Sequence, residues 1–210
     1  MLDMDGTLLD LHFDNHFWLE YVPAKYAEDK GISLEESKAL LKEQYKEIEG
    51  TLNWYCVDHW SRKLELDIAL LKEEVDHLIS VHPYVVDFLD AVNAAGKRTI
   101  LVTNAHQKAL ALKMKKTRLD HHFDEIVSSH QIGHPKESQK FWSSLQNCLP
   151  FDPARTLFID DSLSVLKSAD KYGIKHLIAV LKPDTKAPAR QIEGFSGVEN
   201  FKDLLTDLQK

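Results

Sequence analysis

Two carboxylates near the start of the chain, Asp3 and Asp5, are separated by one residue and followed by Gly6-Thr7. In an extended strand, residues two apart face the same way, so both carboxylates would converge at the end of the strand. Gly6 allows a sharp turn there and leaves backbone amides free to approach an anion. Two adjacent acids are costly to ionise unless a cation lies between them or one keeps its proton. The pair therefore indicates a Mg²⁺ site, general acid–base chemistry, or both.

The same composition also occurs in stretches that do no chemistry of this kind. Asp-X-Asp-Gly is found in plain turns, which stay an alternative for this stretch taken alone. It also begins the pattern of a calcium loop, but the twelfth position would be Asp14 rather than Glu, and Leu8-Leu9 interrupt the ligand series. Residues elsewhere in the chain must therefore decide between a turn and a catalytic pair.

Composition and charge restrict the class of protein. The chain has 210 residues, of which 43% are apolar and 28% charged, as in an ordinary soluble globular protein. Its net charge of −7 argues against a nucleic-acid backbone as partner. A small phosphorylated substrate is compatible with this charge, because it needs only local positive groups.

The sequence contains no signal for export or membrane insertion. There is no run of 18 apolar residues, and no basic segment followed by an apolar stretch at the N-terminus. Cys56 and Cys148 are isolated, which fits a reducing compartment, and we expect a cytoplasmic protein. Only Met1 and Leu2 precede Asp3, so we expect the chain as given to begin inside its first strand.

Residues 14–80 have helical patterns and no convincing strand. The expected helices begin near three capping residues: Asp14, Ser33 (with Glu36 completing a capping box) and Asp67. Pro23 is expected to limit or kink the first helix, and residues 51–64 are rich in aromatic side chains. We therefore expect a helical insertion after the first strand.

The rest of the chain alternates between helix and strand patterns. Strands are expected over residues 98–103, 123–128, 155–160 and 176–180, and helices over 83–96, up to 116, 138–149, 162–172 and 200–209. This alternation predicts an α/β fold with a doubly wound parallel sheet. We expect a core domain formed by residues 1–13 and 81–210, and an α-helical cap domain formed by residues 14–80.

In such sheets, ligands bind beyond the carboxyl ends of the strands. The polar residues at or after the predicted strand ends are Asp3 and Asp5, Thr103 and Asn104, Lys136, and Asp160 and Asp161. Each alone is an ordinary helix cap or solvated side chain. Together they would surround one crevice with acidic groups and a cation. A hydroxyl and an amide in the same crevice could donate to phosphate oxygens.

In this order, these residues resemble the four motifs of the haloacid dehalogenase superfamily of phosphatases. The first motif resembles Asp3-X-Asp5-Gly6-Thr7, the second Thr103, the third Lys136 and the fourth Asp160-Asp161. The resemblance covers the whole chain, including a helical cap inserted after the first motif. It implies that Asp3 is a nucleophile forming an aspartyl-phosphate, and that Asp5 is first the general acid and then the base.

The resemblance also implies Mg²⁺ as a cofactor. Thr103 and Lys136 would hold the phosphoryl oxygens, and the metal would bind Asp3, the backbone carbonyl of Asp5, and Asp161. The family usually has a Gly-Asp pair here, and Asp160 takes the place of the Gly. The chain therefore has two adjacent acids, and Asp160 is an alternative metal ligand. The acid that the family often has three or four residues further on is absent here, where the chain has Ser164 and Val165.

At closer range, five stretches resemble bacterial purine nucleotidases that act on GMP and IMP: residues 3–11, 13–15 with 17–18, 51–56, 103–106 and 158–162. The resemblance implies a purine nucleoside monophosphate as the substrate. Four aromatic residues of the cap are candidates for stacking on the base, although their spacing also fits a core: Phe17, Trp18, Trp54 and Tyr55. The alternatives are a phosphatase for small sugar phosphates or phosphoglycolate, a β-phosphomutase, and a catalytically inactive binding relative. Asp5 argues against carbon–halogen cleavage, since dehalogenases of the family lack an acid there.

Two further groups of residues receive structural interpretations. His12 and His16, like the adjacent His121-His122, lack the further ligands of a zinc site and are expected to be surface or structural residues. The basic run from 113 to 118 is interpreted as a solvated helix end, where positive charge is favourable.

Overall fold

The first residues of the chain lie at the centre of the sheet. The structure is a computed structural model that describes residues 1–208. Leu2 forms parallel bridges with Leu101 on one side and Ile159 on the other. Its N–H donates to the carbonyl of Ile100 at 2.9 Å, and its carbonyl accepts from the N–H of Val102 at 2.8 Å. The expected first strand is therefore present as a short, doubly paired segment next to Asp3.

The other strands extend the sheet on both sides of this segment, and their pairings with one another and with Leu2 are parallel. They are β1 (Ile100–Thr103), β2 (Glu125–Ser128), β3 (Leu157–Asp160), β4 (His176–Val180) and β5 (Ser196–Val198). β1 pairs with β2, and β3 pairs with β4, which pairs with β5. β5 was not predicted, because Ser-Gly-Val is only three residues long and mostly exposed. The α/β fold with a parallel sheet is confirmed.

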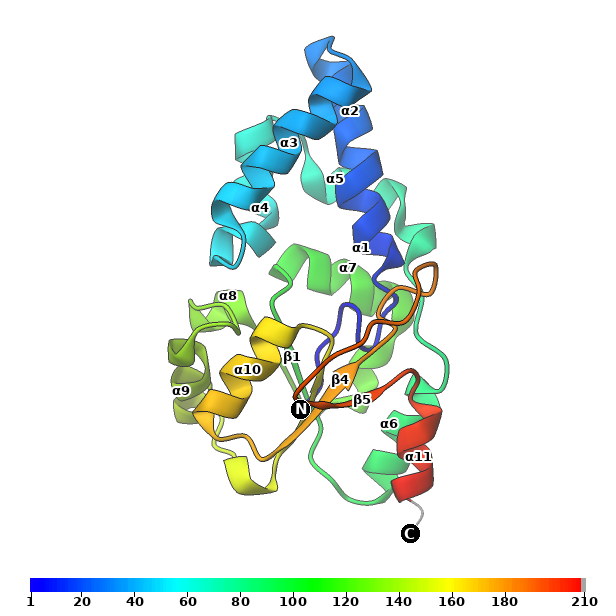
Figure 1. Cartoon of the computed structure of the whole chain (residues 1–210), viewed down its shortest axis with the longest axis vertical. Helices are drawn as coiled ribbons and strands as arrows, with labels where there is room; N and C mark the ends of the chain where they lie inside the picture. Colours follow the sequence, from blue (N-terminus) through cyan, green and yellow to red (C-terminus); the bar gives the residue numbers. More distant parts are fainter. Residues whose placement is uncertain (209–210) are drawn as a thin grey trace.

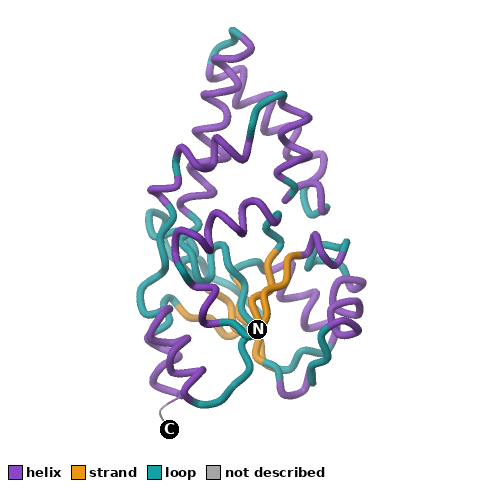
Figure 2. Tube along the Cα trace, turned by 180° about the vertical axis from the view of Figure 1, so that it is seen from behind, coloured by secondary structure: helices purple, strands orange, loops and turns teal. Residues whose placement is uncertain are grey.

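Helices cover both faces of the sheet (Figures 1 and 2). Alternate strand residues face opposite sides, so Ile100 and Val102 pack in one apolar cluster while Leu101 packs in another. The first cluster includes side chains of α9 (Gln139–Cys148) and α10 (Leu163–Tyr172). The second includes side chains of α6 (Val85–Ala94), α7 (Gln107–Thr117) and α11 (Lys202–Leu208). The shorter helical segments of this part are η4 (Leu119–His122), α8 (Ser129–Ile132) and η5 (Pro153–Arg155).

A second group of helices stands above the carboxyl edge of the sheet (Figure 1). They are α1 (His12–His16), η1 (Phe17–Tyr21), α2 (Val22–Lys30), α3 (Leu34–Ile48), η2 (Leu52–Tyr55), α4 (Val57–Leu64), α5 (Ile68–Glu74) and η3 (Asp76–Leu78). Two segments, 8–10 and 80–82, connect this group to the sheet and run antiparallel, with Leu9 bridging Val81. We call residues 12–78 the helical cap. The domain division at residues 14–80 stays a prediction.

The predictions made from helix-capping residues and from Pro23 had different outcomes. The capping box of Ser33 and the N-cap of Asp67 are confirmed. Asp14 does not cap a helix; it lies inside α1, and its carboxylate binds lysine side chains instead. Pro23 does not end the first helix, because the backbone stays helical from α1 through η1, a π-helical turn just before the proline, into α2.

Two helix bounds also differ from the prediction. The helix expected from residue 83 begins at Val85, after Tyr84, whose φ of 65° is left-handed. The helix expected over 200–209 is described over Lys202–Leu208, and Gln209 lies outside the described residues.

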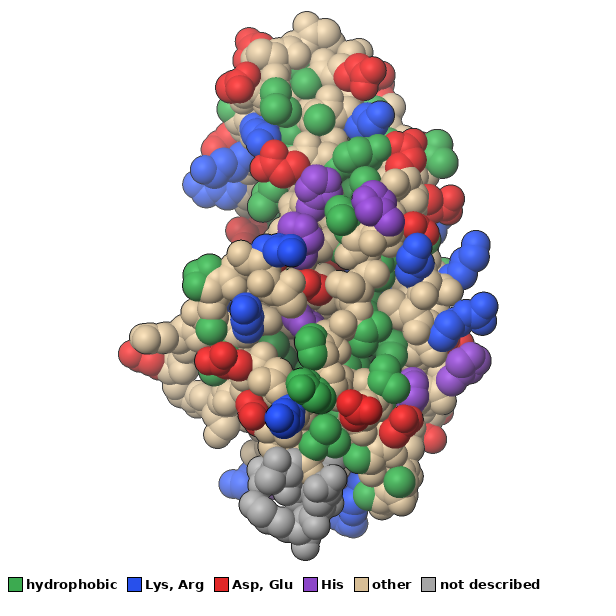
Figure 3. Space-filling model, turned by 90° about the vertical axis from the view of Figure 1, so that its right-hand side faces the viewer, with side chains coloured by type: hydrophobic (Ala, Val, Ile, Leu, Met, Phe, Trp, Pro, Cys, Tyr) green, Lys and Arg blue, Asp and Glu red, His purple; other side chains and the backbone are tan. Residues whose placement is uncertain are grey.

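The surface agrees with the composition. On the face drawn in Figure 3, acidic and basic side chains are interspersed over both the cap and the sheet domain. Within residues 1–208, none of the helices combines the length and the apolar character that crossing a bilayer requires.

Candidate active site

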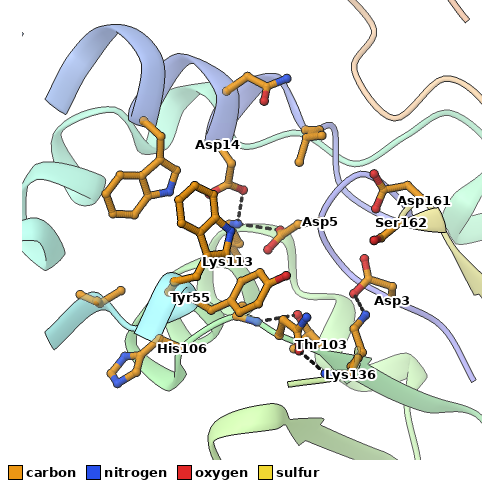
Figure 4. Close-up of a pocket in the computed structure, with 18 of the residues that line it drawn as sticks. Asp3, Asp5, Asp14, Tyr55, Thr103, His106, Lys113, Lys136, Asp161 and Ser162 are labelled. Atoms are coloured by element: carbon orange, nitrogen blue, oxygen red, sulfur yellow. Dashed lines mark hydrogen bonds and ion pairs between the residues drawn. The ribbon is translucent and has the colours of Figure 1, made fainter. Parts of the chain in front are cut away.

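The strand ends and the helical cap enclose a pocket of about 390 Å³. All of the residues predicted at the strand ends line it: Asp3, Asp5, Thr103, Asn104, Lys136, Asp160 and Asp161. The structure thus brings together groups from segments that are more than 100 positions apart in the sequence. Figure 4 shows Asp3, Lys136 and Asp161 on one side of the pocket and Asp5, Lys113 and Asp14 on the other.

Lys136 is the cation at the base of the pocket. Its side chain is 2% exposed, and Nζ lies 2.5 Å from Oδ1 of Asp3 and 2.7 Å from Oδ2 of Asp160. Nζ also donates to the carbonyl of Val102 at 3.1 Å. A buried ammonium is stable only when paired in this way. Lys136 therefore holds two carboxylates on neighbouring strands in fixed positions.

The backbone around Lys136 is itself held by neighbouring side chains. Its N–H donates to Oδ1 of Asn104 at 2.9 Å, and its carbonyl accepts from Nε1 of Trp142 at 3.0 Å. The amide group of Asn104 donates to Oε2 of Glu137 at 3.0 Å. In the structure Asn104 thus contacts the loop that carries Lys136, a positioning contact that the strand-end pattern alone did not indicate.

Burial dominates the ionisation of this pair. It raises the pKa of Asp3 to about 7, against the opposing effect of Lys136. Burial would lower the pKa of Lys136, but Asp160 and Asp3 more than offset it, and the pKa lies well above its usual value. Lys136 is therefore charged whenever the protein is folded near neutral pH.

Three carboxylates, those of Asp3, Asp160 and Asp161, form a cluster whose ligand oxygens lie within 4.8 Å of one another. Burial, together with the charges of Asp160 and Asp3, raises the pKa of Asp161 well above its usual value. Gly6 makes room for this cluster, because a Cβ there would lie 2.7 Å from Cγ of Asp161. The negative charge exceeds what Lys136 alone compensates, and the all-oxygen donor set suits Mg²⁺.

The two aspartates of the fourth motif differ in their partners. Asp160 accepts from Lys136 through Oδ2 and from the N–H of Ser162 through Oδ1, at 2.7 Å in both cases. Asp161 contacts Arg190, whose guanidinium lies 2.7 Å from its carbonyl oxygen and 3.4 Å from Oδ2. Both oxygens of Asp160 are thus occupied, whereas the carboxylate of Asp161 has only a long contact. Arg190 had no signal in the sequence, since it belongs to no motif.

Asp5 faces a second buried lysine, Lys113 of α7 (Figure 4). Nζ of Lys113 lies 2.6 Å from Oδ1 of Asp5 and 2.5 Å from Oδ2 of Asp14. Lys72 of α5 lies 3.0 Å from the other oxygen of Asp14. Burial raises the pKa of Asp5 to about 6, although Lys113 opposes the shift. A chain of alternating charges thus connects Asp5 to the helical cap.

The cap supplies the aromatic wall of the pocket. Trp18, Trp54 and Tyr55, three of the four candidates for stacking on a base, line it together with Tyr45 and Trp60. The hydroxyl of Tyr55 donates to Oε1 of Glu137 at 2.6 Å, which links the cap to the loop beside Lys136.

Phe17, also a predicted base-stacking residue, does not line the pocket. Its ring is fully buried in the apolar core, where it packs against Phe13 and Trp18. Neighbouring aromatic residues on one helix point in different directions, and the sequence alone did not tell which of the two faces inward.

Comparisons with known proteins agree with this geometry. Residues 1–179 match the sequence profile of the haloacid dehalogenase-like hydrolases. The chain belongs to this family. It is 39% identical over 208 residues to the GMP/IMP nucleotidase YrfG of Escherichia coli (strain K12), covering 99% of this chain and 94% of that protein. It is 25% identical over 226 residues to (S)-2-haloacid dehalogenase 1 of Pseudomonas sp. (strain CBS-3), covering 99% of this chain and 96% of that protein.

The fold is shared with solved structures of the family. The crystal structure of a HAD phosphatase from Thermococcus onnurineus superposes with a TM-score of 0.81 at 20% identity, covering 99% of this chain and 95% of that one. Family membership and the full-length similarity to a nucleotidase make this protein a phosphatase of the haloacid dehalogenase superfamily.

One residue of this phosphatase corrects the sequence interpretation. The basic run beginning at Lys113 was predicted to be a solvated helix end. This prediction is wrong for Lys113 itself, since that residue is only 1% exposed. Lys113 lies four residues after buried Ala109 and next to Met114, on the inward face of α7. Lys72 is likewise four residues after buried Ile68. Both buried lysines could have been predicted from the sequence, because each falls at the helical spacing of the apolar residues on the buried face of its helix.

Proposed function

We propose that this phosphatase hydrolyses phosphate monoesters through an aspartyl-phosphate on Asp3 and uses Mg²⁺. The observation that carries the proposal is the buried ion pair of Asp3 with Lys136, 2.5 Å apart at the base of the pocket. A cation there neutralises charge on the nucleophile and on the incoming phosphoryl group, which is the main task in phosphoryl transfer. Since Lys136 binds Oδ1 of Asp3, the other carboxylate oxygen would attack phosphorus.

Asp5 is proposed to move the protons of both steps. Its pKa of about 6 allows it to carry a proton and then to lose it near neutral pH. In the first step, Asp5 protonates the leaving alkoxide oxygen as the P–O bond breaks and the Asp3–phosphorus bond forms. In the second, Asp5 takes a proton from the water that attacks phosphorus, and phosphate leaves Asp3.

The phosphoryl oxygens need donors that are already oriented. The hydroxyl oxygen of Thr103 accepts from the N–H of Ala105 at 3.0 Å, so its hydrogen is directed elsewhere and can bind a phosphoryl oxygen. Lys136 supplies charge on the same side. Asn104, which we predicted as a further phosphate donor, is proposed to act by holding the backbone of Lys136.

The donor set fits Mg²⁺. Asp3 and Asp161 are the proposed carboxylate ligands, together with the backbone carbonyl of Asp5, and Asp160 is assigned to Lys136 because both its oxygens are engaged. When bound, the metal would neutralise charge between nucleophile and phosphate, which is what an all-oxygen site supplies.

The proposed substrate is a purine nucleoside monophosphate such as GMP or IMP. Two findings support this choice: the 39% identity to a GMP/IMP nucleotidase over nearly the full length of both chains, and the aromatic wall opposite Asp3. Trp18, Trp54 and Tyr55 offer flat surfaces for a purine base. The two cysteines are unpaired, in agreement with the reducing cytoplasm that we predicted as the location.

The test is phosphate release from IMP, GMP, phosphoglycolate and a set of sugar phosphates, with and without Mg²⁺, for the wild type and Asp3→Asn. We expect Mg²⁺-dependent hydrolysis of IMP and GMP that is lost in Asp3→Asn. Activity on sugar phosphates alone would keep the mechanism and overturn the nucleotidase proposal. Turnover that survives Asp3→Asn would overturn the nucleophile, and no turnover of any ester would indicate a binding relative.

A further inference from the structure

A cysteine and two histidines come together at the junction of the helical cap and the sheet domain. Cys56 lies between η2 and α4 of the cap, whereas His106 precedes α7 and His130 lies in α8, both in the sheet domain. One ligand atom from each of the three residues lies within 4.8 Å of the others. They are far apart in the sequence, and none of them has a role in the proposed reaction, although Cys56 and His106 lie in segments that resemble the purine nucleotidases.

His130 has an unusual environment for a histidine. Both of its ring nitrogens are buried, and neither makes a hydrogen bond of good geometry among the described residues, although a backbone group of Leu52 lies close enough to oppose the lowering of its pKa. Leaving a buried polar group unpaired costs about 1–3 kcal/mol, so such atoms usually have a partner, including an ion. Burial and neighbouring His106 also lower the pKa of His130 to about 4, which keeps the ring neutral and able to donate a lone pair.

The two other residues present ligand atoms as well. Nε2 of His106 lies 3.8 Å from Oδ2 of Asp58, and Nδ1 lies 3.3 Å from the backbone N of Lys108. To bind a metal through Nε2, the ring must carry its proton on Nδ1, so the contact with the N–H of Lys108 would be given up on metal binding. Sγ of Cys56 accepts from the N–H of His59 at 3.4 Å, at the first turn of α4, where a helix favours negative charge. The rings of His106 and His130 are nearly perpendicular, at 87°, with centroids 4.8 Å apart.

We propose that Cys56, His106 and His130 bind a divalent ion of the zinc class that joins the helical cap to the sheet domain. One sulfur and two imidazole nitrogens are a donor set that zinc prefers and that Mg²⁺ does not. Zinc–ligand bonds of about 2.0–2.3 Å place tetrahedral ligands roughly 3.3–3.8 Å apart, so the ligand atoms would move together by about 1 Å. Oδ2 of Asp58, 3.8 Å from Nε2 of His106, can complete the ligand set.

A bound ion would fix the two parts of the molecule against each other. Cys56 follows Tyr55, and His106 follows Ala105; Tyr55, Ala105 and His106 all line the substrate pocket. The ion would therefore form part of the outer wall of the pocket and hold the cap against the sheet domain. This inference does not depend on the proposed substrate or mechanism.

The first experiment is a titration of the protein with Co²⁺ alone as the probe, in excess Mg²⁺ so that the acidic cluster is occupied by the harder ion. We expect about one equivalent of Co²⁺ with a thiolate-to-cobalt charge-transfer band, displaced by Zn²⁺. Cys56→Ser should abolish the band, and His130→Ala should weaken Co²⁺ binding at least about 100-fold. Cys148→Ser is the matched control, because Cys148 is exposed on α9 and should not contribute.

The second readout is thermal unfolding with and without Zn²⁺. An ion joining the cap and the sheet domain should raise the melting temperature of the wild type and of Cys148→Ser, but not that of Cys56→Ser. Cys56→Ser is nearly isosteric, so its folding without metal can be compared directly with the wild type. A wild type without the charge-transfer band, a band that persists in Cys56→Ser, or one lost in Cys148→Ser would each overturn the proposal.

Discussion

Nζ of Lys113 lies 2.6 Å from Oδ1 of Asp5; the lysine is buried beneath the helical cap, and the Asp5 side chain is 23% exposed. Replacing Lys113 by Met would leave Asp5 without its cation and Asp14 with Lys72 alone. Because the charge of Lys113 opposes the effect of burial, the pKa of Asp5 should rise further above about 6. We expect the turnover number near pH 7 to fall by roughly 10–100-fold, and the acidic limb of its pH profile to move to higher pH.

The pH profile distinguishes this effect from simple loss of structure. Lys115→Met is the matched control, because Lys115 lies on the exposed side of the same helix. Its pH profile and turnover should equal those of the wild type. A Lys113→Met enzyme with a lower rate but an unchanged profile would show that Lys113 acts on stability and not on Asp5.

A second prediction concerns Lys136, which compensates Asp3 and Asp160 at the base of the pocket. In Lys136→Met, two buried carboxylates lose their cation, and the free energy of unfolding should fall by about 3–5 kcal/mol. Adding Asp160→Asn removes one of these charges, so the double variant should be more stable than the single one. The measurement is urea unfolding near pH 7 without added metal. A single variant within about 1 kcal/mol of the wild type would contradict the buried pairing.

A third prediction uses the contrast between two glycines. Gly6 has a φ of 82°, and a Cβ there would lie 2.7 Å from Cγ of Asp161. Gly31 has a φ of 65° with nothing within 4 Å of the same position. Alanine at either site should cost about 1–2 kcal/mol for the left-handed backbone. Only Gly6→Ala should displace Asp161, and we expect it to raise the Mg²⁺ concentration for half-maximal activity by about 10-fold or more. Equal Mg²⁺ requirements in both variants would remove Asp161 from the metal site.

These residues also show which parts of the candidate site could be predicted from the sequence. The strand ends were predictable because short apolar segments end at polar residues, and parallel strands direct those ends to one edge. Asp3, Thr103, Lys136 and Asp160 therefore meet as expected. Their order along the chain resembles the motifs of a known family, and this resemblance added the role expected of each residue.

The remainder depends on which way individual side chains point and on contacts between distant segments. The sequence favours solvent for Lys113, because lysines are usually exposed, yet its position in the helix turns it toward Asp5. Phe17 and Trp18 are neighbours in the sequence, but one packs in the core and the other lines the pocket. The proximity of Cys56, His106 and His130 results from the placement of the cap over the sheet, which no local pattern encodes.

The last prediction concerns His82, which lies in one of the two segments that connect the cap to the sheet. The ring is only 9% exposed, and Nε2 lies 3.0 Å from the carbonyl of Pro183, to which it donates. Burial lowers the pKa of His82 below 6.5, although nearby Asp10 and Asp184 oppose the shift. The unfolded state therefore binds this proton more tightly than the native state, so the contribution of His82 to the free energy of unfolding falls as pH drops below about 6.5.

Replacing His82 by Gln removes that proton while keeping an N–H donor. As pH falls from about 7.5 to 5.5, the free energy of unfolding of the variant should rise relative to that of the wild type, by at most about 1.4 kcal/mol per pH unit. Urea midpoints at constant ionic strength measure it. His121→Gln is the control, since the side chain of His121 is 71% exposed, and its pH dependence should match that of the wild type. If the urea midpoints of His82→Gln and the wild type changed with pH in parallel, His82 would have the same pKa in the folded and unfolded states. The prediction that burial of His82 makes stability depend on pH would then be wrong.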